Sequence, residues 1–190
     1  MMAETKKKLG PKYLPGDLSP DKALERIIRV DQAGEYGAKR IYQGQIDVLG
    51  DTEIGPTLRH MQDQEQEHLD YFNDQLVKRQ IRPTALTPFW HVAGWAVGAG
   101  TAMMSKEAAM ACTVAVEEAI DEHYAEQRDR LIAEDREHEM VETIERFRQE
   151  ELEHRDIGLD NDAEQAAAYP LLYQAISKGS KLAIWLAGRI

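Results

Sequence analysis

The sequence predicts an all-α protein with a single domain over residues 20–190, built as a bundle of four long helices. Apolar residues recur at helical spacing in four long segments, and no segment shows the period-two alternation of a β-strand. The chain has 190 residues, enough to bury one core, and its one cysteine excludes an intrachain disulfide. Residues 1–19 lack this pattern, so we expect a flexible N-terminal arm there.

Capping residues, helix breakers and apolar residues at helical spacing predict where the four helices begin and end. Ser19 suits an N-cap and Pro20 the first helical position, so a helix is predicted over about residues 20–49. After a glycine-rich turn at residues 50–56, a second helix extends up to Arg82-Pro83. Two further helices are marked by residues at helical spacing: Thr113, Val116, Ile120, Tyr124 and Leu131 in the third, and Met140, Ile144, Phe147, Ile157 and the closing Gly158 in the fourth.

Two segments differ from the rest of this acidic chain. Residues 83–105 run for 23 positions without an acid, lysine or arginine, and we expect an apolar crossover helix in which Trp90 and Trp95 lie at the level of lipid headgroups. Residues 169–190 contain no acid but several bases, which predicts a C-terminal amphipathic helix. Together they favour docking on one leaflet of a membrane. Ordinary packing, a subunit interface and a true membrane span are the alternatives.

The charge balance argues against nucleic acid as a partner. The chain has 34 acidic against 23 basic residues, which gives a net charge of −11. Neutralising phosphates needs a clustered basic face, and the sequence shows none.

Glutamate-x-x-histidine occurs twice, at Glu65 with His68 and at Glu151 with His154. Three residues of a helix rotate the chain by about 300°, so the carboxylate and the imidazole of each pair project from one face. Both pairs occupy positions of an apolar stripe and therefore point inward. Buried ionised carboxylates cost several kcal/mol each unless a metal or an opposite charge compensates, and no inward lysine or arginine is available.

The first and third helices each add one inward glutamate, Glu35 and Glu117, because each of these residues lies on an apolar stripe. The neighbouring Glu118 falls about 100° away and is expected to be exposed. Asp31, one turn before Glu35, is a candidate for orienting a histidine ligand, and a bond within its own helix is the alternative.

These positions predict a ferritin-like bundle with a dimetal core, since each half of the chain contributes one lone glutamate and one Glu-x-x-His. Oxygen-rich ligation with one histidine per ion suits iron or manganese better than a closed zinc site. Glu65 and Glu151 are expected to bridge two ions, with His68 near the ion of Glu35 and His154 near that of Glu117. The expected ligands are Glu35, Glu65, His68, Glu117, Glu151 and His154.

Four stretches carry a resemblance to a known family: RIIRVDQAGEYGAKRIYQGQ, DQEQEHLDYFN, GAGTAMMSKEAAMACTVAVEEAIDEHY and FRQEELEHRDIGLDNDAE. Over about Leu24 to Ile190 the chain resembles the demethoxyubiquinone hydroxylases of the Coq7 type, also called 3-demethoxyubiquinol 3-hydroxylases. The resemblance implies a peripheral membrane di-iron monooxygenase. Such an enzyme uses two Fe ions and O2 to hydroxylate the ring of demethoxyubiquinol, a polyprenylated benzoquinol, in ubiquinone biosynthesis. The family's iron ligands match, by position, the six residues chosen from helix phase.

The resemblance also implies roles outside the cluster. His123 and Tyr124 match a His-Tyr pair that moves protons or electrons between quinol and iron, a core tyrosine being the alternative for Tyr124. Arg26, Trp185 and Arg189 match positions linked to direct use of NADH, although relatives commonly have tyrosine where Trp185 stands. Solvated or lipid-facing roles are the alternatives for these three.

The expected location is the cytoplasmic face of a bacterial inner membrane, or alternatively the matrix face of the mitochondrial inner membrane. A lipid-binding companion protein or a quinone-biosynthesis complex is the expected partner.

The main alternative function is that of a ferritin- or rubrerythrin-like protein, which binds or oxidises iron without an organic substrate. Such a protein has no use for the apolar crossover or for the acid-free C-terminal segment. A structural membrane-surface protein without metal is a third interpretation, and it leaves six inward polar residues unexplained.

Overall fold

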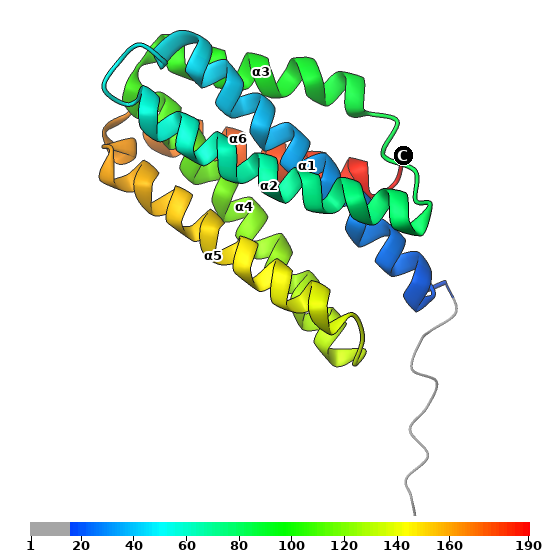
Figure 1. The fold of residues 1–190 in the computed structure, drawn as a ribbon. Coiled ribbons are helices and arrows are strands. Elements are labelled where there is room, and N and C mark those ends of the chain that lie inside the picture. The colour runs from blue at the N-terminus through cyan, green and yellow to red at the C-terminus, as the bar shows by residue number, and fades with distance from the viewer. Residues whose placement is uncertain (1–15) are drawn as a thin grey trace, which may run out of the picture.

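The computed structural model describes residues 16–190, and every regular element in this range is helical (Figure 1). The all-α prediction is therefore confirmed for this range, whereas residues 1–15 of the expected N-terminal arm lie outside the described residues. The elements in chain order are α1 (Pro20–Leu49), α2 (Gly55–Arg79), α3 (Thr87–Met104), α4 (Lys106–Ala133), α5 (His138–Asp160), the short 3₁₀ helix η1 (Ala163–Gln165) and α6 (Tyr169–Ala187).

Local signals set the ends of the first two helices. Ser19 caps α1 as predicted, because its hydroxyl oxygen accepts a hydrogen bond from the backbone N–H of Lys22 at 3.3 Å. The second helix ends at Arg79 and does not reach Arg82-Pro83 as predicted. Gln80 adopts the left-handed conformation, with φ of 55°, and its N–H caps the last turn of α2.

Helices α1, α2, α4 and α5 form the four-helix bundle, in which α1 packs on α2 and α4 packs on α5 (Figure 1). Two clusters of buried apolar residues fill the interior. One includes Phe72 and Leu76 near the end of α2, and the other includes Leu58 and Met61 near its start. The polar residues between them on α2 therefore lie between two apolar layers, in the middle of the bundle.

Helix α3 lies along α1 with the two main chains in direct contact (Figure 1). A Cβ atom on Gly98 would lie 1.9 Å from the carbonyl oxygen of Ile41, and one on Gly44 would lie 2.3 Å from that of Trp95. Only glycine fits at these positions. The predicted apolar crossover helix therefore exists, and it is packed closely against the bundle. Among residues 16–190, no helix combines the length and the apolar character that a membrane crossing requires.

Helix α6 packs mainly on α4. The Tyr173 hydroxyl donates to the Glu118 carboxylate, and Lys181 Nζ lies 2.6 Å from Glu122 Oε2. Glu118 is therefore half-buried under α6, not exposed as the helix phase suggested. Apolar side chains remain exposed on both added helices: Phe89, Val92, Met103 and Met104 on α3, and Leu171, Leu182 and Trp185 on α6.

Candidate dimetal centre

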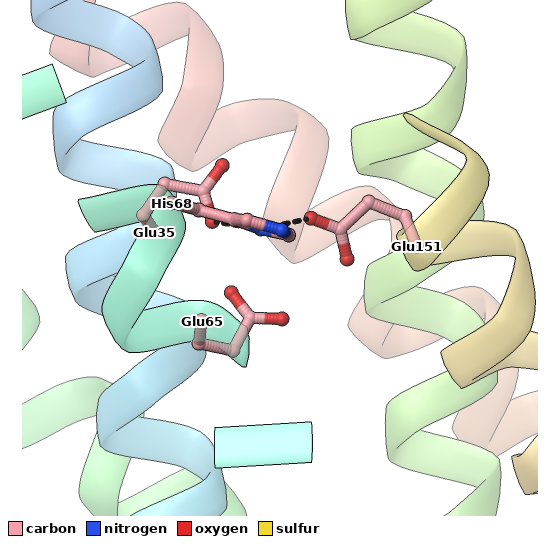
Figure 2. Close-up of side chains that lie close together, drawn as sticks. All are labelled: Glu35, Glu65, His68 and Glu151. Carbon is pink, nitrogen blue, oxygen red and sulfur yellow. Dashed lines mark ion pairs between the residues drawn. The ribbon is translucent and has the colours of Figure 1, made fainter. Parts of the chain in front are cut away.

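Six polar side chains from four helices meet in the middle of the bundle. Each has a relative exposure of 1% or less. Figure 2 shows the part of this cluster in which the imidazole of His68 lies between the carboxylates of Glu35 and Glu151. The six are Glu35 on α1, Glu65 and His68 on α2, Glu117 on α4, and Glu151 and His154 on α5.

The six residues form two groups that share two carboxylates. Glu35 and His68 make one group with Glu65 and Glu151, and Glu117 and His154 make the other with the same pair. Within each group, one potential ligand atom per residue lies within 4.8 Å of the others. Two cations held in this way would have Glu65 and Glu151 between them.

The histidines face the carboxylates through Nδ1. His68 Nδ1 lies 3.1 Å from Glu151 Oε1 and 3.5 Å from Glu35 Oε2. His154 Nδ1 lies 3.2 Å from Glu65 Oε1 and 3.4 Å from Glu151 Oε2. The same nitrogen of both rings therefore points to the space between the glutamates.

The donor atoms of this cluster fit metal ions, because many of them are buried without a hydrogen-bond partner. Both carboxylate oxygens of Glu65 and of Glu151 are in this state, and so is one oxygen each of Glu35 and Glu117. Nδ1 of His68 and of His154 is likewise unpartnered. Buried polar atoms normally have partners, so a set of orphan atoms facing one space indicates a site for cations.

The pKa shifts of the glutamates also indicate a site for cations. Burial, with repulsion from Glu151, raises the pKa of Glu65 and of Glu117 well above the usual range. Burial acts on Glu151 in the same direction, but the nearby imidazoles of His154 and His68 outweigh it and lower the pKa of Glu151. Four carboxylates in one buried space thus repel one another unless positive charge compensates.

Two buried tyrosines donate hydrogen bonds to Glu35 and Glu117, the two glutamates that belong to one group each. Each tyrosine bonds to the glutamate of the other helix. Tyr42, seven residues after Glu35 on α1, donates to Glu117 Oε1 on α4 at 2.5 Å. Tyr124, seven residues after Glu117 on α4, donates to Glu35 on α1. The sequence motif singled out Tyr124 alone, because Tyr42 stands on the apolar stripe of α1 and reads as a core residue.

The chain matches the family described as "Ubiquinone biosynthesis protein COQ7" over residues 22–187. The chain belongs to the COQ7 family. The 3-demethoxyubiquinol 3-hydroxylase of Rhodospirillum rubrum is 56% identical over 179 residues, which are 93% of this chain and 83% of that protein. The human NADPH-dependent 3-demethoxyubiquinone 3-hydroxylase, mitochondrial, is 55% identical over 170 residues, 88% of this chain and 78% of that protein. The 5-demethoxyubiquinone hydroxylase, mitochondrial, of Saccharomyces cerevisiae is 42% identical over 182 residues, with shares of 88% and 78%.

Residues beside the cluster of this COQ7-family chain do not all lie where the sequence suggested. Asp31 orients no cluster histidine, because it accepts a hydrogen bond from Gln127 Nε2 at 2.6 Å, on α4. The cluster histidines bond instead through Nε2 to Glu150, at 2.6 Å from His68, and to Gln64, at 3.1 Å from His154. Glu150 and Gln64 each stand directly before a shared glutamate, and this position was the sequence signal for them. A side chain at this position reaches the opposite helix.

His123 lies away from the cluster. The Gln127 amide that donates to Asp31 also lies 2.6 Å from His123 Nε2, so this ring nitrogen accepts and is unprotonated. Burial, together with the positive charge of Arg26, lowers the pKa of His123 to about 4. The imidazole is therefore neutral at ordinary pH. Gln127 connects it to Asp31, one turn before Glu35.

Arg26 and Trp185 line one cavity of about 390 Å³ together with His123. Arg130, Lys181 and Glu126 also line it, so three cationic side chains face one carboxylate, and we call it the cationic cavity. The third residue of the predicted set, Arg189, places its guanidinium 3.8 Å from the centre of the Trp185 ring. The structure thus brings Arg26 and Trp185 into one cavity, with Arg189 stacked on its tryptophan.

A second cavity, of about 370 Å³, is apolar and lies between α1, α3, α4 and α6. Its wall includes Ala38, one turn after Glu35, and Val116, directly before Glu117, so it backs onto the dimetal centre. We call it the apolar cavity.

Glycines leave room in the apolar cavity, since a Cβ on Gly34, Gly37 or Gly179 would meet nothing within 4 Å. Of the two tryptophans expected at the headgroups, Trp90 lines the apolar cavity with its indole N–H buried and unpartnered. Trp95 is 39% exposed and donates to Asp47 at 2.8 Å.

Proposed function

We propose that this protein hydroxylates the ring of demethoxyubiquinol, a 2-polyprenyl-3-methyl-6-methoxy-1,4-benzoquinol, with O2 in ubiquinone biosynthesis. The observation that carries the proposal is the buried carboxylate–histidine cluster beside an apolar cavity, in a chain of the COQ7 family. The relatives named as demethoxyubiquinol or demethoxyubiquinone hydroxylases support the substrate. An iron-storage protein of the ferritin type would have no use for the apolar cavity.

The metals in this proposal are two irons per chain. Glu35 and His68 would hold one, Glu117 and His154 the other, and Glu65 and Glu151 both. Oxygen-rich ligation with few nitrogens is typical of such sites. When bound, two ferrous ions supply electrons and open coordination positions for the reduction of O2.

The protein's own residues bind the quinol and exclude water. The apolar cavity accepts the ring, and its wall at Ala38 and Val116 places the ring one side-chain layer from Glu35 and Glu117. The polyprenyl tail then leaves between α3 and α6, which line the cavity and expose apolar side chains. This arrangement supports a peripheral position on a membrane. We propose the cytoplasmic face of a bacterial inner membrane, with the matrix face of the mitochondrial inner membrane as the alternative.

The same exposed surface on α3 and α6 is where we place a lipid-binding companion protein or a quinone-biosynthesis complex.

Tyr124 and His123 have separate roles in the proposal. Burial and the charge of Glu35 raise the pKa of Tyr124 well above its usual range, so the phenol stays protonated and holds Glu35 in place. As a buried hydroxyl beside the cluster, Tyr124 is the group that we assign to proton movement between quinol and centre. His123 is neutral, lines the cationic cavity and is joined through Gln127 to Asp31, so we assign it to electron transfer between that cavity and the centre and not to the uptake of a proton.

A single-turnover experiment tests the proposed reaction. The iron-loaded, reduced protein with a short-chain demethoxyubiquinol under ¹⁸O2 should give a product whose ring carries one ¹⁸O atom, read by mass spectrometry. Metal-free protein is the control and should give none. Consumption of O2 without a labelled quinol would contradict hydroxylation and would favour a ferroxidase.

For the electron donor, we propose a nicotinamide dinucleotide bound at the cationic cavity through Arg26, Trp185 and Arg189. Relatives are named NADPH-dependent, and the cavity wall can take an anionic ligand. Arg26→Gln should raise the apparent KM for NADH or NADPH roughly tenfold, because a hydrogen bond to a charged group is worth about 1.5–3 kcal/mol. Iron content and turnover with a chemical reductant should not change. An unchanged KM for both nucleotides would remove Arg26 from the proposed site.

A further inference from the structure

The two halves of the dimetal centre differ in what stands behind each histidine. His68 Nε2 bonds to the carboxylate of Glu150 on α5, and His154 Nε2 bonds to the amide oxygen of Gln64 on α2. The two positions are equivalent, because each directly precedes a shared glutamate and reaches across to the other helix. One histidine therefore has an anionic partner and the other a neutral one.

The carboxylate partner is held in place by its surroundings. Arg146 Nη1, one turn earlier on α5, lies 3.0 Å from Glu150 Oε1. The guanidinium of Arg146 lies 4.5 Å from the centre of the Phe147 ring, and that ring lies 4.0 Å from the ring of His68. Glu150 is thus fixed between an arginine and the histidine. At the equivalent position before Gln64, one turn earlier on α2, stands the exposed residue His60.

We propose that Glu150 and Gln64 make the two halves unequal, so that the Glu35–His68 half binds a metal ion more tightly than the Glu117–His154 half. Both partners fix the histidine with its proton on Nε2 and leave Nδ1 free to ligate. A carboxylate also increases the electron density on Nδ1, which a neutral amide does far less. Glu150 is a positioning residue in this inference, acting through His68.

This inference rests on the proposed dimetal site and adds an order to it. The tighter half fills first. The looser half, held by Glu117 and His154, is then the one whose ligation changes more readily during a reaction.

The test is an anaerobic calorimetric titration of the metal-free full-length chain with Co²⁺, repeated with Fe²⁺. The unmodified chain should show two binding steps whose affinities differ about tenfold or more, since partners behind metal ligands typically contribute 10–100-fold. Glu150→Gln gives both histidines an amide partner, and should weaken the first step until the two steps merge. Glu153→Gln, an exposed glutamate on the same helix, removes the same charge and should leave both steps unchanged.

Variants that keep only one metal site show which half loses affinity in Glu150→Gln. In Glu117→Gln, which leaves the Glu35–His68 half, adding Glu150→Gln should weaken the remaining site about tenfold or more. In Glu35→Gln, which leaves the other half, it should change nothing. The reciprocal variant Gln64→Glu should tighten the second step of the otherwise unmodified chain, and it keeps the test decisive if Glu150→Gln fails to fold.

The outcomes separate this inference from the proposed function. Two equal steps in the unmodified chain, or an equal loss in both halves after Glu150→Gln, would overturn the inequality and leave the hydroxylase proposal standing. A chain that binds neither metal would overturn both. Merged steps in Glu150→Gln, with two separate steps retained in Glu153→Gln, would support the inference.

Discussion

Glu117→Gln should reduce metal binding from about two ions per chain to about one and lower hydroxylation roughly a thousandfold or more. The amide keeps the size of the side chain and can still accept from Tyr42, but it removes a charged oxygen donor from the half that contains His154. A lost metal ion withdraws several kcal/mol of charge stabilisation, and each 1.36 kcal/mol is a factor of ten in rate. Metal analysis and single-turnover assays on one preparation measure both effects.

Glu118→Gln is the matched control, one residue away on the same helix. Glu118 faces α6 and accepts from Tyr173, and the amide can keep this hydrogen bond. This variant should bind two ions and remain active. Equal losses in the two variants would mean that the charge of α4, not a specific ligand, supports the centre, and a loss confined to Glu118→Gln would move the ligand to that residue.

Gly37→Leu should lower kcat/KM for the quinol by about tenfold to a hundredfold while iron content stays the same. A side chain at this position grows into the apolar cavity, because nothing lies within 4 Å of its Cβ. Overfilling a packed space costs about 1–3 kcal/mol, which here falls on the bound substrate. Leucine is also a better helix former than glycine by roughly 1 kcal/mol, so the melting temperature should not fall.

Gly100→Leu controls for the change of residue type. Its Cβ also meets nothing within 4 Å, but Gly100 on α3 does not line the apolar cavity. Turnover of the soluble short-chain quinol should therefore be unchanged in this variant. If Gly37→Leu were fully active with that substrate, the ring would have to reach the centre by another route.

Much of the fold could be predicted from residue spacing, because the long helices carry their own caps and apolar stripes. Ser19 and the stripe of α1 define a helix whose observed bounds are the predicted ones. The end of α2 could not be found in this way. The left-handed residue there is Gln80, and glutamine gives no local signal of such a conformation.

The inward direction of Glu35 and Glu117 could be predicted, since charge on an apolar stripe is visible in one helix alone. The partners of these residues could not, because each comes from another helix. Asp31 has the spacing of a group that orients a ligand, yet its partner Gln127 stands on α4. Tyr42 looked like core because an aromatic ring on a stripe gives no sign of where its hydroxyl points.

The contact of main chain with main chain between α1 and α3 also determines which wall of the apolar cavity is mobile. At Gly44 and Gly98 no side chain separates the two helices, so α3 has no rotamers through which to shift along α1. Helix α6 is held to α4 by longer side chains, among them the exposed pair of Lys181 and Glu122, and exposed side chains change rotamer within nanoseconds. We therefore expect fast changes in the size of the apolar cavity to come from motion of α6, while α3 keeps its position on α1.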